Sequence, residues 1–410
     1  MKNVVVVGAG HAGVELVASL RENGFAGRID LLSDEPDLPY QRPPLSKEYI
    51  KKPTSAPLLR PAQFYADNDV RLHAGIAATA IERDARRLLL SDGSSLIYDH
   101  LVLATGARNR LLGLPGIDRP QVYQMRTLAD VRRIIAGLSG WKHVTIIGGG
   151  FIGLEAAGLL STMCVKVALI ELAPRLMQRS VSPTVSRWFL DYHRANGVEF
   201  HMERHVTSIE ETSSGVKVSL SDGIGIATDA VVMAAGVIPN TELASDAGLH
   251  TDNGIVVDSS LSTADAAISA LGDCASYPNV FAGGRARLES VQNATDQARF
   301  LAVRLCGRAG SYSAFPWFWS IQGAARLQIA GLGEAGLTEI VRGDTASGKF
   351  SVFLFDGDRL RAVESVNSVA DHMASRRLLA IPQECRLTPD QARDATCNLK
   401  DLVSPVHQAA

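Results

Sequence analysis

The sequence has little of what marks secreted, membrane or metal-binding proteins. Only five of its 410 residues are cysteine, and none are spaced as C-x-x-C. We therefore expect small buried or partly buried thiols rather than a disulfide or a zinc site. No segment reaches the roughly 18 apolar residues that cross a bilayer, and the four-valine run behind MKN is too short for the core of a signal peptide. We expect a cytoplasmic protein with no membrane contact.

A strong charge of either sign is also missing. The chain has 41 Lys and Arg against 43 Asp and Glu, a formal net charge of −2, which gives no support to a nucleic-acid or anionic-membrane partner. Hydrophobic residues make up 46% of the chain and charged residues 20%, as is ordinary for a globular protein. The length allows two or three domains, each with its own core.

What is present begins with a strand, a glycine loop and a helix. In VVVVGAGHAGVELVASL, Gly8, Gly10 and Gly13 form G-x-G-x-x-G between an apolar run and helical spacing. Such glycines permit a tight turn, close approach of a pyrophosphate and close helix packing, and the helix N-terminus faces the phosphate charge. The strand RIDLLSDE then places Asp34 21 residues after Gly13, where a carboxylate can bond a ribose hydroxyl. A dinucleotide site is the preferred interpretation, and a simple turn is the alternative.

The same pattern recurs in VTIIGGGFIGLEAAGLL at 144–160. Gly148, Gly150 and Gly153 form the second motif, with Ile152 inside it, and the strand KVALIE ends at Glu171, 18 residues after the last glycine. A carboxylate there accepts bonds from the 2′- and 3′-hydroxyls of an adenosine ribose and repels a 2′-phosphate. This position favours NADH over NADPH.

Two arginines close to this strand leave the coenzyme preference open. Arg175 and Arg179 follow Glu171 closely, so either could hold a phosphate, and we keep Arg179 among the cofactor candidates. Solvated charge on a helix face is an equally good interpretation. Because each loop cradles one pyrophosphate, two loops indicate two dinucleotides, and a flavin with a nicotinamide would form a hydride-transfer pair.

Three further apolar strands fit this arrangement. LVLATGA at 101–107 and VVMAAGVIPN at 231–240, which contains Gly236, resemble paired returns of the chain between two nucleotide domains. ISALGDCA ends at Asp273, whose carboxylate could bond a ribitol hydroxyl or only cap a turn. The helix predicted from about Ser290 to Cys306 would stabilise negative charge on a reduced flavin if its N-terminus faces the ring.

Together these residues make the chain resemble the FAD-containing, NADH-dependent ferredoxin reductases that supply bacterial oxygenases. The resemblance covers essentially the whole chain and includes RPPLSKEYI at 42–50, MRTLAD at 125–130, RLESVQNATDQA at 287–298 and PWFWSIQ at 316–322. It implies that NADH lies on the second loop with Glu171 at its ribose. It also implies that FAD is held by Ala12, Asp34, Arg42, Lys47, Ala78, Arg126, Asp273 and Val291.

The resemblance also implies three catalytic candidates. A lysine and a glutamate, Lys47 and Glu155, would pair beside flavin and nicotinamide as an electrostatic frame for hydride transfer; the alternative is that Glu155 only favours its helix N-terminus. Trp319 would shield the flavin edge or belong to an aromatic cluster. The family usually has aspartate where this chain has Ile321, so we expect local geometry or part of a docking face to differ there.

The electron acceptor is inferred by elimination and from the resemblance. No cysteine pair follows the second strand, and the second nucleotide region holds only Cys164, so internal disulfide chemistry is not expected. The resemblance names a 2Fe-2S ferredoxin serving a haem-thiolate monooxygenase or a Rieske dioxygenase, and it favours a monomer. An NADH oxidase, a quinone reductase and a redox-sensing module remain alternatives. An acidic ferredoxin would dock on a basic patch, with candidates Arg285, Arg287, Arg308, Arg326 and Arg342. For any one of these arginines, ordinary solvated surface is the better interpretation.

The expected fold is α/β, with two Rossmann-like dinucleotide-binding domains, one inserted in the other, and a small α+β C-terminal domain. The FAD domain is predicted at 1–112 and 240–315, the NADH domain at 113–239 and the third domain at 316–410. Within the third domain, KFSVFLF and RLRAVESV are predicted to form a hairpin through Asp356-Gly357.

Overall fold

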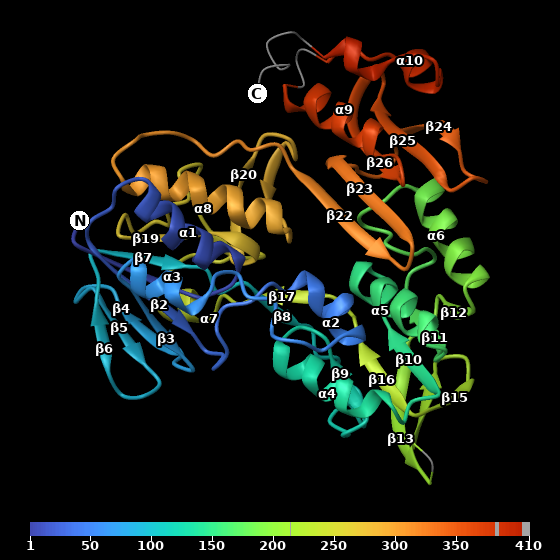
Figure 1. The fold of residues 1–410 in the computed structure, drawn as a ribbon, viewed down its shortest axis with the longest axis horizontal. Coiled ribbons are helices and arrows are strands. Elements are labelled where there is room, and N and C mark those ends of the chain that lie inside the picture. The colour runs from blue at the N-terminus through green and yellow to red at the C-terminus, as the bar shows by residue number, and fades with distance from the viewer. Residues whose placement is uncertain (214, 382–384, 404–410) are drawn as a thin grey trace. The chain divides into compact units, whose positions relative to one another are not determined.

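The computed structural model describes residues 1–213, 215–381 and 385–403, and the chain divides into two compact units (Figure 1). The predicted three-domain boundaries stay a prediction, and their parts at 382–384 and 404–410 lie outside the described residues. The first unit contains Met1–Arg42, Thr54–Arg108 and Val237–Ala314. The second unit contains Pro43–Pro53, Asn109–Gly236 and Phe315–Ala410.

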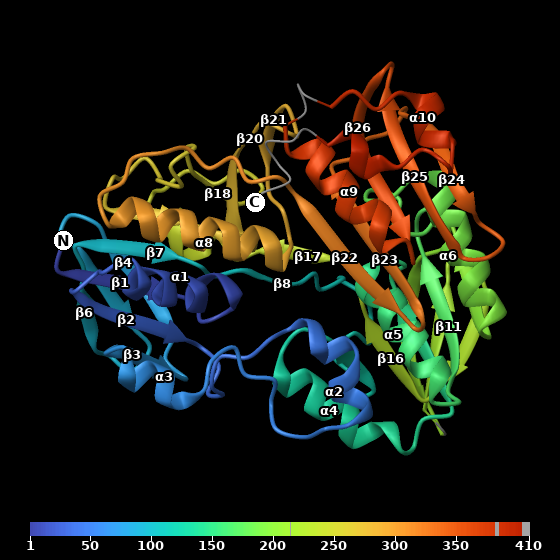
Figure 2. The same ribbon diagram turned by 45° about the horizontal axis from the view of Figure 1, so that its top comes forward.

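A parallel five-stranded sheet forms the centre of the first unit. Its order is β19-β7-β1-β2-β3, and β-branched valines make the central strand fully buried from Val4 to Val6. Helices α1 (His11–Glu22) and α8 (Val291–Leu305) lie side by side (Figure 2), and α8 confirms the predicted helix. The five strands are β1 (Asn3–Val7), β2 (Arg28–Ser33), β3 (Val70–Ala74), β7 (His100–Leu103) and β19 (Ile268–Ala270).

Smaller elements complete the first unit. Two three-stranded sheets, β4-β5-β6 and β18-β20-β21, accompany three short helical segments. The strands are β4 (Ala78–Glu82), β5 (Arg87–Leu90), β6 (Ser95–Ile97), β18 (Ile255–Val256), β20 (Ala275–Asn279) and β21 (Gly284–Ala286). The helical segments are α3 (Ala62–Asp67), α7 (Glu242–Asp246) and η2 (Gly272–Cys274), and the crossings between units carry β8 (Ala107–Asn109) and β17 (Val237–Pro239).

The second unit repeats the parallel design. Its parallel sheet has the order β12-β11-β10-β16-β9. A separate antiparallel sheet, β13-β14-β15, is formed by the three strands that lie between β12 and β16 in sequence. The strands are β9 (Val122–Gln124), β10 (His143–Ile147), β11 (Lys166–Glu171), β12 (Val198–Met202), β13 (Val206–Thr212), β14 (Gly215–Leu220), β15 (Gly225–Thr228) and β16 (Ala230–Met233). The helical segments are η1 (Pro43–Ser46), α2 (Glu48–Lys51), α4 (Leu128–Leu138), α5 (Phe151–Thr162) and α6 (Pro183–Ala195).

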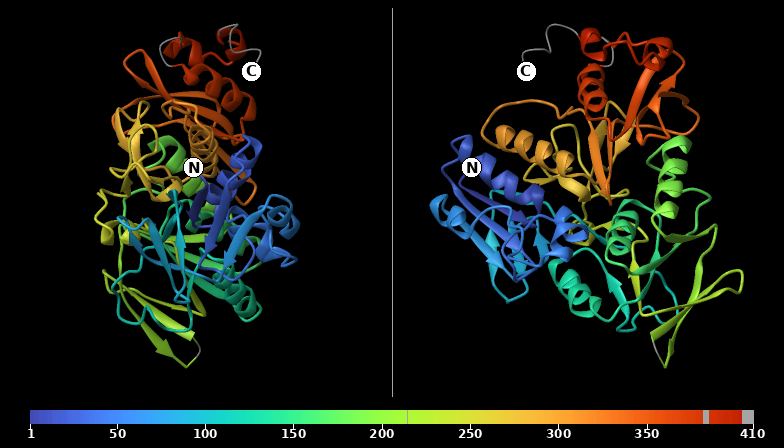
Figure 3. Two further views of the ribbon diagram at one scale, coloured as in Figure 1. Left: turned by 90° about the vertical axis from the view of Figure 1, so that its left-hand side faces the viewer. Right: turned by 45° about the vertical axis from the view of Figure 1, so that its right-hand side comes forward.

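An antiparallel sheet with helices against it forms the C-terminal part of the second unit (Figure 3). Its order is β22-β23-β26-β25-β24, and the predicted hairpin through Asp356-Gly357 is confirmed by the antiparallel pairing of β25 and β26. The strands are β22 (Trp317–Gln322), β23 (Ala325–Gly331), β24 (Thr338–Asp344), β25 (Lys349–Asp356) and β26 (Arg359–Val366). The helical segments are α9 (Val369–Ala380), α10 (Pro389–Arg393) and η3 (Leu399–Leu402).

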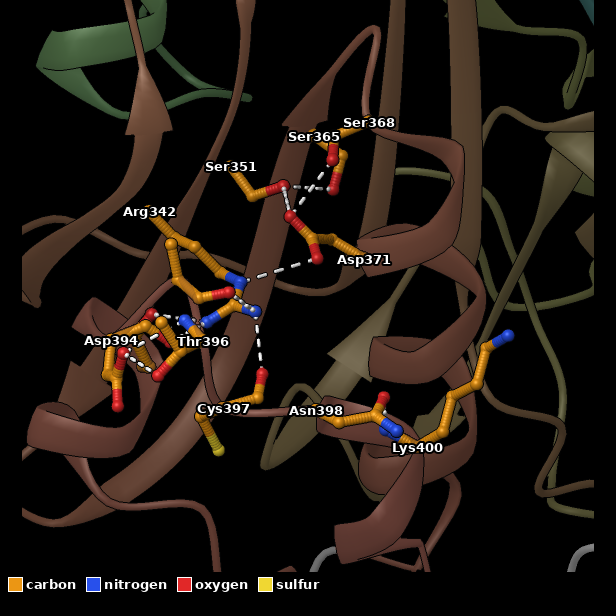
Figure 4. A network of polar contacts seen from close by, with 12 residues as sticks. Arg342, Ser351, Ser365, Ser368, Asp371, Asp394, Thr396, Cys397, Asn398 and Lys400 are labelled. Carbon is orange, nitrogen blue, oxygen red and sulfur yellow. Dashed lines mark hydrogen bonds and ion pairs between the residues drawn. The ribbon is translucent and has the colours of Figure 1, made fainter.

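A buried arginine ties the end of the described chain to this sheet (Figure 4). Arg342 on β24 donates to the backbone oxygens of Asp394 and, at 2.7 Å, Cys397, and its Nε lies 3.4 Å from Asp371 Oδ1. Asp371 Oδ2 accepts a bond from Ser351 at 2.9 Å. The prediction that Arg342 belongs to a surface docking patch is therefore wrong, because the side chain is consumed by internal bonds.

The predicted fold class is confirmed. Each parallel sheet has a glycine loop after its central strand, and the antiparallel sheet with its helices forms the predicted α+β part. Within the described ranges, no helix is long and apolar enough to cross a membrane.

Candidate functional site

The first glycine of each loop occupies a position that no other residue fits. Gly8 and Gly148 have φ of +108° and +113°, in the region that favours glycine. A Cβ at either position would lie 2.2 Å from a carbonyl oxygen, that of Ala104 or of Ala234. The two loops therefore share one backbone design, as the repeated motif predicts.

The remaining glycines leave space for a phosphate and bring each helix close to its strand. Gly10 and Gly150 are the N-caps of α1 and α5, neither helix has a side-chain cap, and a Cβ at either glycine would meet nothing within 4 Å. A Cβ at Gly13 or Gly153 would lie 1.9 or 2.0 Å from the carbonyl oxygen of its loop's first glycine. Uncapped N–H groups and open space fit a dinucleotide pyrophosphate at both loops.

Glu171 is held beside the second loop by two backbone amides. Its Oε2 accepts the Gly149 N–H at 2.6 Å and its Oε1 accepts the Ala173 N–H at 2.7 Å. Each carboxylate oxygen keeps a lone pair that could accept a ribose hydroxyl. These two bonds fix the orientation of the carboxylate. Ile152, on α5 beside this loop, is 44% exposed.

The two arginines near Glu171 differ in their contacts. Arg175 donates to the carbonyl oxygens of Val181 at 2.6 Å and Gln178 at 2.7 Å. Its interpretation as a solvated helix-face charge is wrong, because its guanidinium closes the turn that leads into α6. Arg179 is exposed, so its assignment to the cofactor stays a prediction.

In the first unit the two acids after β2 differ, because Asp34 is exposed and Glu35 forms an ion pair. Asp34 is exposed, so its carboxylate is accessible to a ribose hydroxyl. Glu35 accepts a bond from Arg42 Nη2 at 2.8 Å and another from the Tyr40 hydroxyl, and Arg42 also lies 5.4 Å from the centre of the Tyr40 ring. Sequence reasoning missed Glu35, although the adjacent acids in SDE were a signal. It orients Arg42, a predicted FAD residue.

Three further predicted FAD residues come from separate segments of the first unit. Asp273 is half-buried in η2, directly after Gly272, whose N–H donates to Gln297 Oε1 at 2.7 Å. A Cβ at Gly272 would lie 3.1 Å from Ala12 Cβ, so the turn before Asp273 lies against the start of α1. Val291 is the first residue of α8. Sequence reasoning missed Gln297, which fixes this turn from α8.

Lys47 and Glu155 form the ion pair that the resemblance implies. The distance from Lys47 Nζ to Glu155 Oε2 is 2.6 Å, and the side chains are 13% and 4% exposed. Glu155 lies in the first turns of α5 and Lys47 follows η1, so the pair adjoins the second glycine loop. Ser46 and Ser320 also donate to Glu155, at 2.6 and 2.8 Å. Nothing in the sequence indicated these two serines.

Trp319 stacks on a second tryptophan of the same strand. Trp317 and Trp319 are stacked with centroids 5.4 Å apart, and the Arg376 guanidinium lies 4.1 Å from the centre of the Trp317 ring. Phe318 instead contacts Phe151, with centroids 4.6 Å apart. The two tryptophans share one face of β22 and are both partly exposed, so Trp319 lies outside the core. Its role as a flavin shield stays a prediction.

The other predicted cofactor residues lie in three places. Ala78 begins β4 and is half-buried. Arg126 is half-buried just before α4, and its N–H donates to Asp130 at 3.2 Å. Gly236 has φ of +90°, and a Cβ at this position would meet nothing within 4 Å. The predicted residues Lys47, Arg126 and Trp319 belong to the second unit, and the other predicted FAD residues belong to the first.

The remaining docking candidates do not behave alike. Arg287 is held by Glu289 at 2.7 Å and by the Asp273 carbonyl at 3.1 Å, and its side chain is only 10% exposed. Arg285 donates to the carbonyl oxygens of Val257 and Ser276. Arg308 and Arg326 are exposed and are the candidates best placed for a partner. Among the described residues all five cysteines are free, and no cluster of three or more His, Cys, Asp or Glu could hold a metal.

Comparisons with known proteins identify the family to which the chain is similar. Residues 2–298 match the family described as Pyridine nucleotide-disulphide oxidoreductase, and residues 317–403 match Reductase C-terminal. Rhodocoxin reductase of Rhodococcus erythropolis is 46% identical over 401 residues, covering 97% of this chain and 93% of that protein.

Two solved structures resemble the whole chain. The ferredoxin reductase for the CYP199A2 system from Rhodopseudomonas palustris has a TM-score of 0.95 at 45% identity, covering 98% of this chain and all of that one. The covalent putidaredoxin reductase–putidaredoxin complex has a TM-score of 0.94 at 38% identity, covering 100% of this chain and 99% of that one.

The chain therefore belongs to the pyridine nucleotide-disulphide oxidoreductase family. Similarity along its full length confirms the predicted relationship to the ferredoxin reductases of oxygenase systems, and with it the predicted oxidoreductase class. The family implies an FAD and a nicotinamide dinucleotide, for which the two glycine loops have the required space and donors.

Proposed function

We propose that this chain is a ferredoxin reductase that passes electrons from NADH through FAD to a 2Fe-2S ferredoxin, which then feeds a haem-thiolate monooxygenase or a Rieske dioxygenase. The observation that carries the proposal is similarity over the whole chain, C-terminal domain included, to a reductase solved in complex with putidaredoxin. When bound, FAD accepts two electrons as a hydride and releases them singly. The chain's own residues hold, orient and shield the two dinucleotides.

The preference for NADH over NADPH rests on Glu171 and Arg175. The anchored Glu171 carboxylate favours ribose hydroxyls and repels a 2′-phosphate. Arg175 donates from Nη1 to the Val181 carbonyl oxygen and from Nη2 to the Gln178 carbonyl oxygen, which directs its guanidinium toward the turn before α6. Arg179 is exposed, with no bond that would direct it toward a 2′-phosphate among the residues that the structure describes, whereas the Glu171 carboxylate is held by two backbone amides.

The Lys47–Glu155 pair places fixed charge next to the second glycine loop, within the second unit. Glu155 is almost fully buried, so it is stabilised by its donors rather than by water. Charges that are held in place before the reaction stabilise a transition state without the cost of reorganisation. We therefore assign both residues an electrostatic role in hydride transfer.

Replacing Glu155 by Gln tests this role. The substitution preserves shape but removes the charge, so the rate at which NADH bleaches the flavin absorbance should fall about tenfold or more. Rapid mixing of flavin-loaded protein with NADH gives the rate and the NADH affinity in one titration. If neither changes in Glu155→Gln, the pair has no part in hydride transfer.

Docking of an acidic ferredoxin should depend on exposed arginines. Arg308 and Arg326 are available, whereas Arg287 and Arg342 are bound internally. We propose that the reductase acts as a monomer in this reaction. The rate of ferredoxin reduction should fall with ionic strength, because salt screens complementary charge. The Debye length shortens severalfold between about 0.02 and 0.3 M salt. A rate that stays constant over this range would contradict electrostatic docking.

A further inference from the structure

The buried carboxylate of Glu155 is bonded by donors from two separate segments. Oε2 accepts Lys47 Nζ and the Ser46 hydroxyl, both at 2.6 Å. Oε1 accepts the Ser320 hydroxyl at 2.8 Å and the Ile321 N–H at 3.3 Å. Each oxygen thus receives two bonds. Ser320 is the closer of the two donors to Oε1, and its hydroxyl comes from β22 at the start of the C-terminal domain.

The direction of the bond from Ser320 is fixed by its neighbours. An ionised carboxylate only accepts, so the Ser320 hydroxyl must donate to Glu155. The same oxygen accepts Gln322 Nε2 at 3.3 Å, and Gln322 Oε1 lies 2.9 Å from His193 Nε2. Because the amide oxygen accepts, His193 must carry its proton on Nε2. Burial lowers the pKa of His193 and keeps the ring neutral, with Nδ1 unbonded among the described residues.

The bonded row of His193, Gln322, Ser320 and Glu155 is shielded from water. Ser320, Gln322 and His193 are fully buried, and Glu155 is 4% exposed. A buried hydroxyl cannot exchange its partner for solvent, so each bond restricts the next one along. The row runs from α6 through β22 to α5 and ends at the ion pair with Lys47.

We propose that Ser320 is a positioning residue, by which the C-terminal domain sets the orientation of the Glu155 carboxylate. The inference rests on the role proposed above for Glu155. Without the hydroxyl, the bonds to Oε1 among the described residues are reduced to the longer one from the Ile321 N–H. Lys47 and Ser46 still hold Oε2, so the carboxylate plane can turn about that end and loses its fixed orientation. That N–H exists with isoleucine as well as with aspartate, so the departure from the family at Ile321 leaves this bond intact.

The test is a double-mutant cycle on the flavin-loaded protein. Ser320→Ala should slow bleaching of the flavin by saturating NADH about tenfold, because a bond to a charged group is lost, with little change in NADH affinity. In a Glu155→Gln background the same substitution should change the rate less than about twofold. Ser320 is proposed to act through the charge of Glu155, and that charge is absent in this background. Gln322→Met should also slow bleaching of the flavin, but by a smaller factor than Ser320→Ala.

A matched control separates positioning from stability. Ser351→Ala also removes a fully buried serine hydroxyl from the same sheet, but that hydroxyl bonds to Ser365 and Asp371. It should lower Tm about as much as Ser320→Ala and leave the rate unchanged. The inference is overturned if Ser320→Ala reacts at the wild-type rate, or if it slows both backgrounds equally. If Glu155→Gln itself is as fast as wild type, the proposed role of Glu155 fails, and the inference falls with it.

Discussion

The buried carboxyl group of Glu364 should make the stability of the second unit depend on pH. This glutamate of β26 is 1% exposed, and its two oxygens accept the Ser182 N–H at 2.9 and 3.0 Å and the Ser182 hydroxyl at 2.6 Å. Ser182 is the N-cap of α6. Burial raises the pKa of Glu364 from 4.5 to about 7, against the Ser182 bonds and the charge of Arg175, which lower it; nearby Glu339 raises it further.

The magnitude follows from the pKa in the folded and unfolded states. Between about 4.5 and 7 the native protein holds a proton on Glu364 that the unfolded chain has released. The free energy of unfolding therefore falls as pH rises through this window, by about 3 kcal/mol in all. Glu364→Gln cannot titrate and its amide oxygen can still accept from Ser182. The variant should escape this loss.

Thermal unfolding of wild type and Glu364→Gln at pH 5 and pH 8 measures the effect. The window from pH 5 to pH 8 contains about 2.5 kcal/mol of the loss, which is about 5–10 °C in Tm for a cooperative unit of 150–250 residues. The Tm difference between variant and wild type should grow by that amount in favour of the variant. Glu334→Gln, whose carboxylate is 60% exposed, should run parallel to wild type. Parallel curves for Glu364→Gln would refute the reasoning.

Three further perturbations have distinct outcomes. Gly148→Ala should weaken NADH binding at least about tenfold and leave FAD content unchanged, because its Cβ would clash with the Ala234 carbonyl at 2.2 Å; titration and flavin absorbance separate the two. Glu171→Ser should raise the KM for NADH about tenfold and change that for NADPH much less, measured by steady-state kinetics. Arg342→Met should lower the free energy of unfolding by about 3 kcal/mol, seen as a lower Tm, because it removes the ion-pair partner of Asp371 and the donor to the carbonyl oxygens of Asp394 and Cys397.

Local patterns predicted the parts of the site that depend on backbone conformation. The spacing of each glycine motif led to a loop in which Gly8 or Gly148 alone fits, because such positions are defined by a few consecutive residues. The strand-ending acid Glu171 followed from the same repeat. The hairpin at Asp356-Gly357 was found because its turn residues and alternating strands are adjacent in sequence.

Contacts between distant residues could not be predicted in this way. Ser320 and Glu155 are 165 positions apart, and serine is too common for its position to reveal such a bond. Arg342 was mistaken for a surface residue because an arginine is usually exposed, whereas here backbone carbonyls some 50 residues later surround it. Glu35 was missed because its neighbour Asp34 satisfied the expected motif.

NADH oxidation with and without ferredoxin tests the central claim most directly. Purified flavin-loaded protein would be supplied with NADH and oxygen alone, then with a panel of 2Fe-2S ferredoxins coupled to a one-electron dye. The proposal predicts slow turnover with oxygen and strong stimulation by at least one ferredoxin. Fast turnover with oxygen or quinone, and no stimulation by any ferredoxin, would contradict it and make the protein an NADH oxidase or quinone reductase.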